Sequence, residues 1–202
     1  TQVLYPVENV LACIEVKTTL YSDTVKECMK NKRALLDLVP VRTYPDGSAH
    51  PIFIVLAYRT DISPQKIYEK FLARDQQDRP DLLCVLEDGI LGCSGACLGG
   101  AVGDDFQIGL TLLRNDSDGS GEPYHRIDKN HAARTITIRE RLYPIVEYNG
   151  VRFACDPARA LLLFVEAVLR RLAEQSNRPP PALTHYLDER VRELAWLSQS
   201  IV

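Results

Sequence analysis

Apolar and polar positions follow two patterns along the first half of this chain. Short runs of apolar, mostly β-branched residues predict strands over 10–20, 51–58 and 81–86. After the first two runs, apolar residues recur at helical spacing. They predict one helix to about residue 39, capped by Ser22 or Asp23, and a second from Ser63 to about residue 74. This alternation predicts an α/β core with parallel pairing among the later strands.

The second half continues the pattern with longer irregular stretches. Residues 106–113 are strand-like, 135–138 alternate as a half-exposed strand, and 156–175 form a predicted helix with a broad apolar face. A run of prolines then sets apart residues 179–202, which carry the single tryptophan, Trp196, on a predicted amphipathic helix. We therefore expect an α/β domain over 1–178 and a C-terminal docking helix over 179–202.

The two C-terminal helices allow two interpretations. The helix over 156–175 has more apolar positions than one sheet contact needs, and Trp196 stands where a docking helix would carry its anchor. Together they form the surface of a homodimer, or they complete the core of a monomer. The sequence leaves both open.

The composition is that of an ordinary globular protein, with 46% hydrophobic and 25% charged residues. No run of eighteen apolar residues predicts a membrane span, and the first residues show no signal-peptide pattern. Six cysteines are most consistent with reduced thiols, so we expect a cytoplasmic protein that does not contact membranes. The net charge of −3 excludes a uniformly basic nucleic-acid surface and leaves only local basic patches.

Two charged residues, Glu15 and Lys17, interrupt the most apolar of the predicted strands. Residues two apart in a strand point to the same face, so the carboxylate and the ammonium are predicted to lie side by side. Burying a charge is costly unless it is paired or holds a metal. The two charged side chains of this strand therefore form either a structural ion pair or one side of a catalytic site.

The segment Val-Leu-Ala-Cys-Ile-Glu-Val-Lys-Thr-Thr-Leu, residues 10–20, resembles the third motif of the PD-(D/E)xK nuclease superfamily. In that motif an acidic residue and a lysine end a central strand that a helix follows. The resemblance is closest to a bacterial branch with a similar strand. It implies a restriction-endonuclease-like core, a mixed central sheet flanked by helices, to which this chain adds a C-terminal helical extension.

The same resemblance implies metal-dependent hydrolysis of DNA, in restriction or defence against phage, with Mg²⁺ or Mn²⁺ as cofactor. Glu15 would ligate the cation, the Val16 backbone carbonyl would be a further ligand, and Lys17 would position or polarise the attacking water. The alternative function is a non-catalytic nuclease-like module that binds nucleic acid or a partner protein.

The helix after this strand is the most basic stretch of the chain. Its Lys26, Lys30 and Arg33 are the candidate contacts to the DNA backbone, and a solvated helix face is the alternative.

One feature departs from the superfamily pattern. A further metal-binding aspartate belongs on the strand before the Glu-x-Lys strand, but no aspartate precedes Glu15, and the only earlier acid is Glu8. In a continuous strand Glu8 would point to the opposite face from Glu15. We therefore expect a portion upstream of Thr1 to supply the aspartate.

Overall fold

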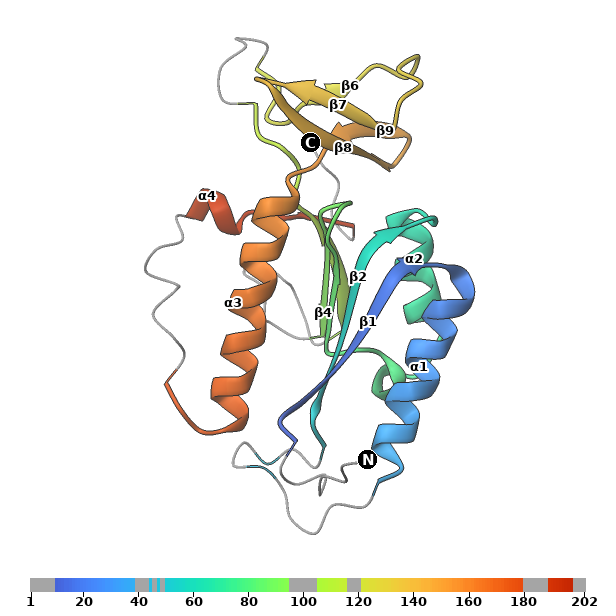
Figure 1. Ribbon diagram of the computed structural model, residues 1–202, viewed down its shortest axis with the longest axis vertical. Helices are drawn as coiled ribbons and strands as arrows, with labels where there is room; N and C mark the ends of the chain where they lie inside the picture. Colours follow the sequence, from blue (N-terminus) through green and yellow to red (C-terminus); the bar gives the residue numbers. More distant parts are fainter. Residues whose placement is uncertain are drawn as a thin grey trace.

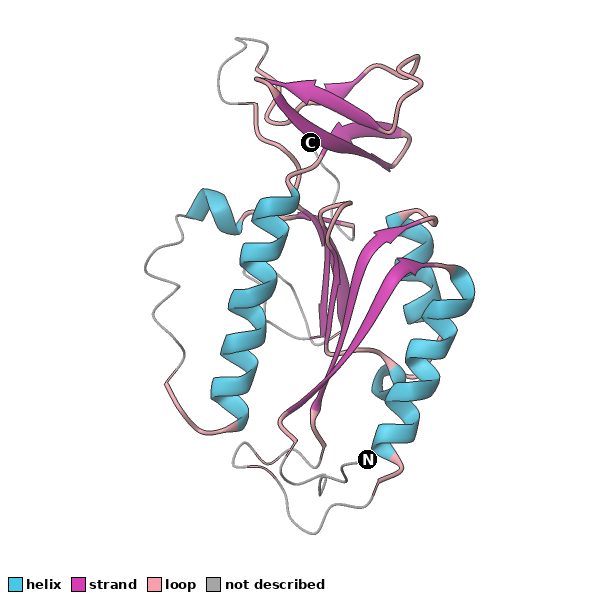
Figure 2. Cartoon of the chain, viewed as in Figure 1, coloured by secondary structure: helices cyan, strands magenta, loops and turns pink. Residues whose placement is uncertain are grey.

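The computed structural model describes residues 10–38, 44, 47, 50–94, 105–115, 121–179 and 189–197. A six-stranded sheet has helices on both faces, and a smaller four-stranded sheet lies beyond one end of it (Figure 1). Strands and helices alternate through the first half, and the second half adds the small sheet and a long helix (Figure 2). The chain is therefore a mixed α/β protein with a mixed central sheet flanked by helices, which confirms the coarse prediction from the sequence.

The elements have the following bounds. The large sheet contains β1 (Ala12–Leu20), β2 (Ile52–Thr60), β3 (Leu82–Val85), β4 (Ile90–Ser94), β5 (Phe106–Leu110) and β10 (Ala195–Trp196). The small sheet contains β6 (Arg126–Ile127), β7 (Thr135–Ile138), β8 (Arg141–Tyr148) and β9 (Val151–Ala154). The helices are α1 (Ser22–Leu36), α2 (Pro64–Leu72), α3 (Pro157–Gln175) and α4 (Glu189–Arg192), with a 3₁₀ turn, η2 (Gln76–Asp78).

The large sheet has the strand order β1-β2-β3-β4-β5-β10. One part of it is parallel and the other part is antiparallel. β1 and β2 pair in parallel through the crossover helix α1, and β2 and β3 pair in parallel through α2. The remaining pairs, β3–β4, β4–β5 and β5–β10, are antiparallel. Helices α1 and α2 lie on one face of this sheet and α3 lies on the other (Figure 1).

The position of β1 corrects one expectation. Among the described residues β1 is at the edge of the sheet, not at its centre. The buried residues of α3 pack with apolar side chains of β2, β3 and β4, and this cluster does not extend over the outer half of β1. As a result Ile14 and Val16 are 54% and 57% exposed, so the strand is not buried on both faces.

The C-terminal segment corrects a second expectation. Trp196 is not on a docking helix but in β10, where it pairs with Gly109 of β5 and is 3% exposed. A Cβ atom at Gly109 would lie 3.0–3.3 Å from Leu194 and Trp196, which would have to shift, so the glycine permits this close packing. Trp196 therefore completes the core of one chain and is not free to anchor a partner.

Two other predicted elements are confirmed. The helix expected over 156–175 is α3, and Asp156 caps it by accepting a hydrogen bond from the Arg159 amide at 3.2 Å. The half-exposed strand expected over 135–138 is β7. In the described part of the chain, no helix is both long and apolar enough to cross a membrane.

Candidate functional site

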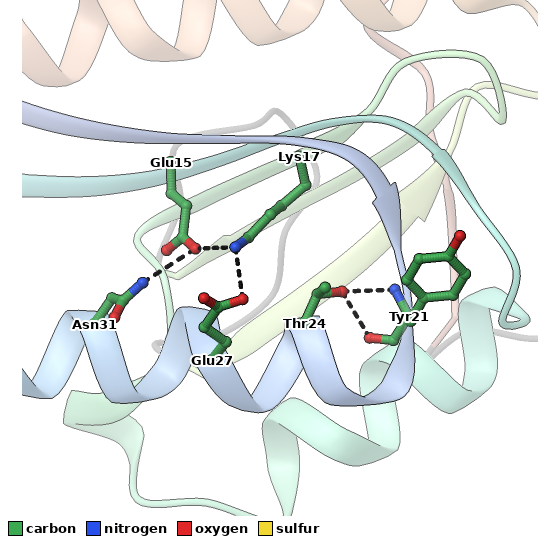
Figure 3. Close-up of polar contacts among 6 residues, drawn as sticks. All are labelled: Glu15, Lys17, Tyr21, Thr24, Glu27 and Asn31. Carbon is green, nitrogen blue, oxygen red and sulfur yellow. Dashed lines mark hydrogen bonds and ion pairs between the residues drawn. The ribbon is translucent and has the colours of Figure 1, made fainter.

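Glu15 and Lys17 lie side by side on the face of β1 that α1 covers (Figure 3). The Lys17 ammonium is 2.8 Å from Glu15 Oε1, as the spacing of two residues predicts for a strand. It also lies 2.7 Å from Oε2 of Glu27, which α1 contributes. One ammonium is therefore held between two carboxylates from neighbouring elements.

Helix α1 completes the site with a second polar side chain. Asn31 follows Glu27 by four residues, so both project from one side of the helix. Asn31 Nδ2 donates a hydrogen bond to Glu15 Oε1 at 3.1 Å. Sequence reasoning did not identify Glu27 or Asn31. The signal that would have found them is the i, i+4 spacing on a helix that begins directly after the Glu-x-Lys strand.

The junction between β1 and α1 fixes the strand against the helix. Tyr21 is the single residue between them, and its amide donates to Thr24 Oγ1 at 2.6 Å. The Thr24 hydroxyl donates back to the Tyr21 carbonyl at 2.9 Å (Figure 3). This reciprocal pair satisfies the Tyr21 amide and fixes the tight turn between β1 and α1. Because the turn folds α1 back against β1, Glu27 comes to face Lys17.

Burial differs among the three charged side chains. Glu15 and Lys17 are 13% and 19% exposed, whereas Glu27 is 54% exposed, so the site opens to solvent on the helix side. Glu15 Oε2 is buried and has no hydrogen-bond partner among the described residues. A buried carboxylate oxygen without a donor is costly, so this atom is available for a cation, a water or another donor.

The charge states follow from these contacts. The hydrogen bonds from Lys17 to Glu15 and then to Glu27 raise the pKa of the lysine above its usual value, and Lys17 stays an ammonium at neutral pH. Next to it, burial and then the Glu15 carboxylate raise the pKa of the Cys28 thiol to about 12. Lys17 is therefore no general base in this arrangement, and Cys28 is no thiolate nucleophile.

The donor set fits a hard divalent cation. Glu15 and Glu27 are carboxylates held 2.7–2.8 Å from one positive centre, and an oxygen-binding cation would take the same two groups. Among the described residues no group of three His, Cys, Asp or Glu side chains is placed to hold a metal. Mg²⁺ keeps several waters and needs only one or two carboxylates, so the pair is sufficient.

The Val16 carbonyl points along the sheet, away from β2. Ile52 N–H donates to the Leu11 carbonyl at 3.0 Å, which directs the carbonyls of the odd residues of β1 towards β2. In the regular part of the ladder, the backbone groups of Ala12, Ile14 and Val16 therefore point to the outer edge of the strand. The proposed backbone ligand therefore lies at the open edge of β1.

The three basic residues expected to contact DNA lie elsewhere. Lys26, Lys30 and Arg33 line a hollow of about 220 Å³ on a different side of α1, together with Arg74 and Asp78. Arg33 is 3.6 Å from Asp78, and Lys26 is 3.0 Å from Asp23. The fold gathers the three cations into one patch, but not around Glu15 and Lys17. Glu8, the earlier acid, lies outside the described residues.

Comparisons of the chain with protein-family models, with curated proteins and with solved structures gave no match. The assignment of the site therefore depends on its own geometry and on the motif in β1.

Proposed function

We propose that this protein hydrolyses phosphodiester bonds of DNA with Mg²⁺ or Mn²⁺, and that its α/β core is restriction-endonuclease-like. One observation carries the proposal. A nearly buried carboxylate and an ammonium, Glu15 and Lys17, share one face of a strand, and a second carboxylate, Glu27, faces them at 2.7 Å from the ammonium. This combination joins oxygen ligands for a cation to a positive charge for a phosphate.

Each residue has a distinct part in that chemistry. Glu15 and Glu27 would hold the cation, and the Val16 carbonyl at the strand edge would add an oxygen ligand. When bound, the cation lowers the pKa of a water and polarises the phosphoryl oxygen. Lys17 then turns from the two carboxylates towards the phosphate, where its ammonium offsets the growing negative charge.

The basic patch of Lys26, Lys30, Arg33 and Arg74 provides the electrostatic attraction that the net charge of −3 does not. Basic side chains that neutralise phosphates release counterions, so binding through this patch weakens as the salt concentration rises. The patch and the Glu15–Lys17 site lie on different sides of α1. A DNA segment bound by the patch would therefore have to pass around the helix to reach β1.

A second candidate function is a nuclease-like module that binds nucleic acid or a partner protein without cutting. The observation in its favour is the closed ion pair, because Lys17 already bonds one oxygen of each carboxylate. A site that is filled by its own ammonium can be purely structural.

Nicking of a supercoiled plasmid with Mg²⁺ or Mn²⁺ separates the two functions. We expect nicking that EDTA abolishes and that falls by orders of magnitude in Glu15→Gln, while Glu174→Gln, an exposed control on α3, keeps the wild-type rate. Circular dichroism must show that both variants fold. DNA binding without cutting under either cation would favour the second function, and equal rates in Glu15→Gln and wild type would overturn the site assignment.

A further inference from the structure

The outer edge of β1 is long, and no described residue pairs with it. β1 spans nine residues and, in the part of the chain that the structure describes, pairs on one side only, with β2. By the alternation that the Ile52 N–H to Leu11 carbonyl bond sets, Ala12, Ile14 and Val16 direct their N–H and C=O groups to this edge. Proteins normally protect such an edge with a bulge, a proline or a covering element, because its unpaired groups template another strand.

The side chains at this edge are also apolar. Ile14 and Val16 are 54% and 57% exposed on the face opposite α1. A strand placed against the edge would bury both and would satisfy the outward backbone groups. As far as the described residues go, the edge therefore has the two properties of a strand-addition site: backbone donors and acceptors outside any ladder, and exposed apolar side chains beside them.

The charges in β1 identify the occupant. In an antiparallel pair the outward-facing even residues must oppose one another. If Val16 opposes Val16 of the partner subunit, then Glu15 lies directly opposite Lys17 of the partner subunit. If the two-fold axis moves by one residue, to position 15 or position 17, two copies of Glu15 or two copies of Lys17 lie directly opposite each other. Like charges in that arrangement repel. The strand is therefore complementary to itself in a single central register.

The same register brings a second ammonium to the carboxylate of the site. Glu15 Oε2 is buried without a hydrogen-bond partner in the described structure, while Oε1 is held by Lys17 and Asn31. In the central register the partner subunit's Lys17 lies across from this carboxylate, with side chains about 5 Å apart at Cβ. The four charges would then alternate in sign around the two-fold axis.

We propose that two copies of this chain associate through antiparallel pairing of their β1 strands, about a two-fold axis at Val16. The pairing joins two six-stranded sheets into one continuous sheet and brings Ile14 and Val16 of both copies together on its open face. The inference does not rest on DNA hydrolysis. Pairing engages the Val16 carbonyl, so a cation at that oxygen competes with the second strand.

Light scattering of the 202-residue chain in EDTA, up to about 200 µM because a strand-only interface is small, tests the proposal. We expect the mass to approach about 45 kDa, twice 22.7 kDa. Val16→Pro should remain near 22.7 kDa, because it removes an outward N–H without touching the β1–β2 ladder. Ile14→Lys, at an exposed position, is a second disrupting variant in case Val16→Pro does not fold.

The matched control is Tyr58→Ser, which removes a 53% exposed apolar side chain from the neighbouring strand β2 and should still dimerise. A wild-type monomer at the highest concentration would overturn the proposal. So would a dimer that survives both Val16→Pro and Ile14→Lys, because it would then use another surface.

Discussion

Lys17 bridges Glu15 and Glu27, at 2.8 and 2.7 Å, so one ammonium neutralises two carboxylates from different elements. Glu15 is nearly buried and Glu27 is half exposed. The pair of carboxylates therefore faces solvent on one side, and the ammonium occupies the position where an incoming cation would be bound.

Replacing this ammonium should make the protein depend on a cation. In Lys17→Met the two carboxylates repel each other, and we expect the free energy of unfolding to fall by about 1–3 kcal/mol. Millimolar Mg²⁺ should restore part of this loss and should stabilise the variant more than it stabilises wild type, because ligand binding to the folded state shifts unfolding. Urea titrations with and without Mg²⁺ measure both effects, with Lys26→Met as the exposed control.

The same variant separates binding from chemistry. Lys17→Met keeps the carboxylates, so Mn²⁺ binding measured by calorimetry should persist, while plasmid nicking should fall at least about 100-fold. Nicking at the wild-type rate would show that Lys17 is only a structural partner of Glu15.

A second ion pair is structural. Lys32 of α1, with its side chain 8% exposed, lies 2.6 Å from Asp81, which also accepts the Phe53 amide at 2.7 Å. Lys32→Ala leaves Asp81 without its cation, and we expect a loss of about 1–3 kcal/mol in the free energy of unfolding. Lys30→Ala, exposed on the same helix, should change it by less than about 0.5 kcal/mol. Equal effects in urea unfolding would show that the Lys32–Asp81 pair contributes nothing.

Asp88 should make stability fall as pH rises. Burial raises the pKa of this carboxyl above its ordinary value of 3.8, and the carboxylates of Glu87 and Asp61 add to the effect. Between 3.8 and the raised pKa the folded state binds more protons than the unfolded state, so the free energy of unfolding decreases through this window. Asp88→Asn keeps an oxygen for the Thr60 amide and should be more stable than wild type at pH 7, but not at pH 3. Thermal unfolding at both pH values measures the difference.

The basic patch should control the salt dependence of DNA binding. Replacing Lys26, Lys30 and Arg33 together by alanine should weaken binding, and should reduce the slope of log K against log salt by about 0.9 for each phosphate that is no longer neutralised. Fluorescence anisotropy with a labelled duplex measures both quantities, with Lys129→Ala as the exposed control. An unchanged slope would mean that these cations form a solvated helix face.

Local patterns predicted the elements better than their places in the sheet. The spacing of Glu15 and Lys17 fixed their common face, because alternation is a property of the strand alone. The exposure of Ile14 and Val16 was not predictable, because it depends on where α3 packs across the sheet. A β-branched apolar run favours a strand whether that strand lies at the centre or at the edge.

Long-range pairing limited the prediction of the tail and of the site. Trp196 has apolar neighbours at helical spacing, but its partner, Gly109, is remote in sequence, and that contact determines a strand. Glu27 belongs to a helix whose sequence pattern indicates only a basic face, and its role is visible only because the turn at Tyr21 places α1 against β1.

The pairing of β10 with β5 affects the order in which the chain can fold during synthesis. Leu110 and Ala195 are neighbours in the sheet although they are 85 positions apart. The ribosome adds about 5–20 residues per second, so the outer edge of β5 waits roughly 4–17 seconds for its partner strand to be made. During that time the small sheet and α3 have been made, but the large sheet still exposes an unpaired strand. A nascent chain is therefore open to wrong strand pairing late in translation, when a chaperone that covers β5 would protect it most.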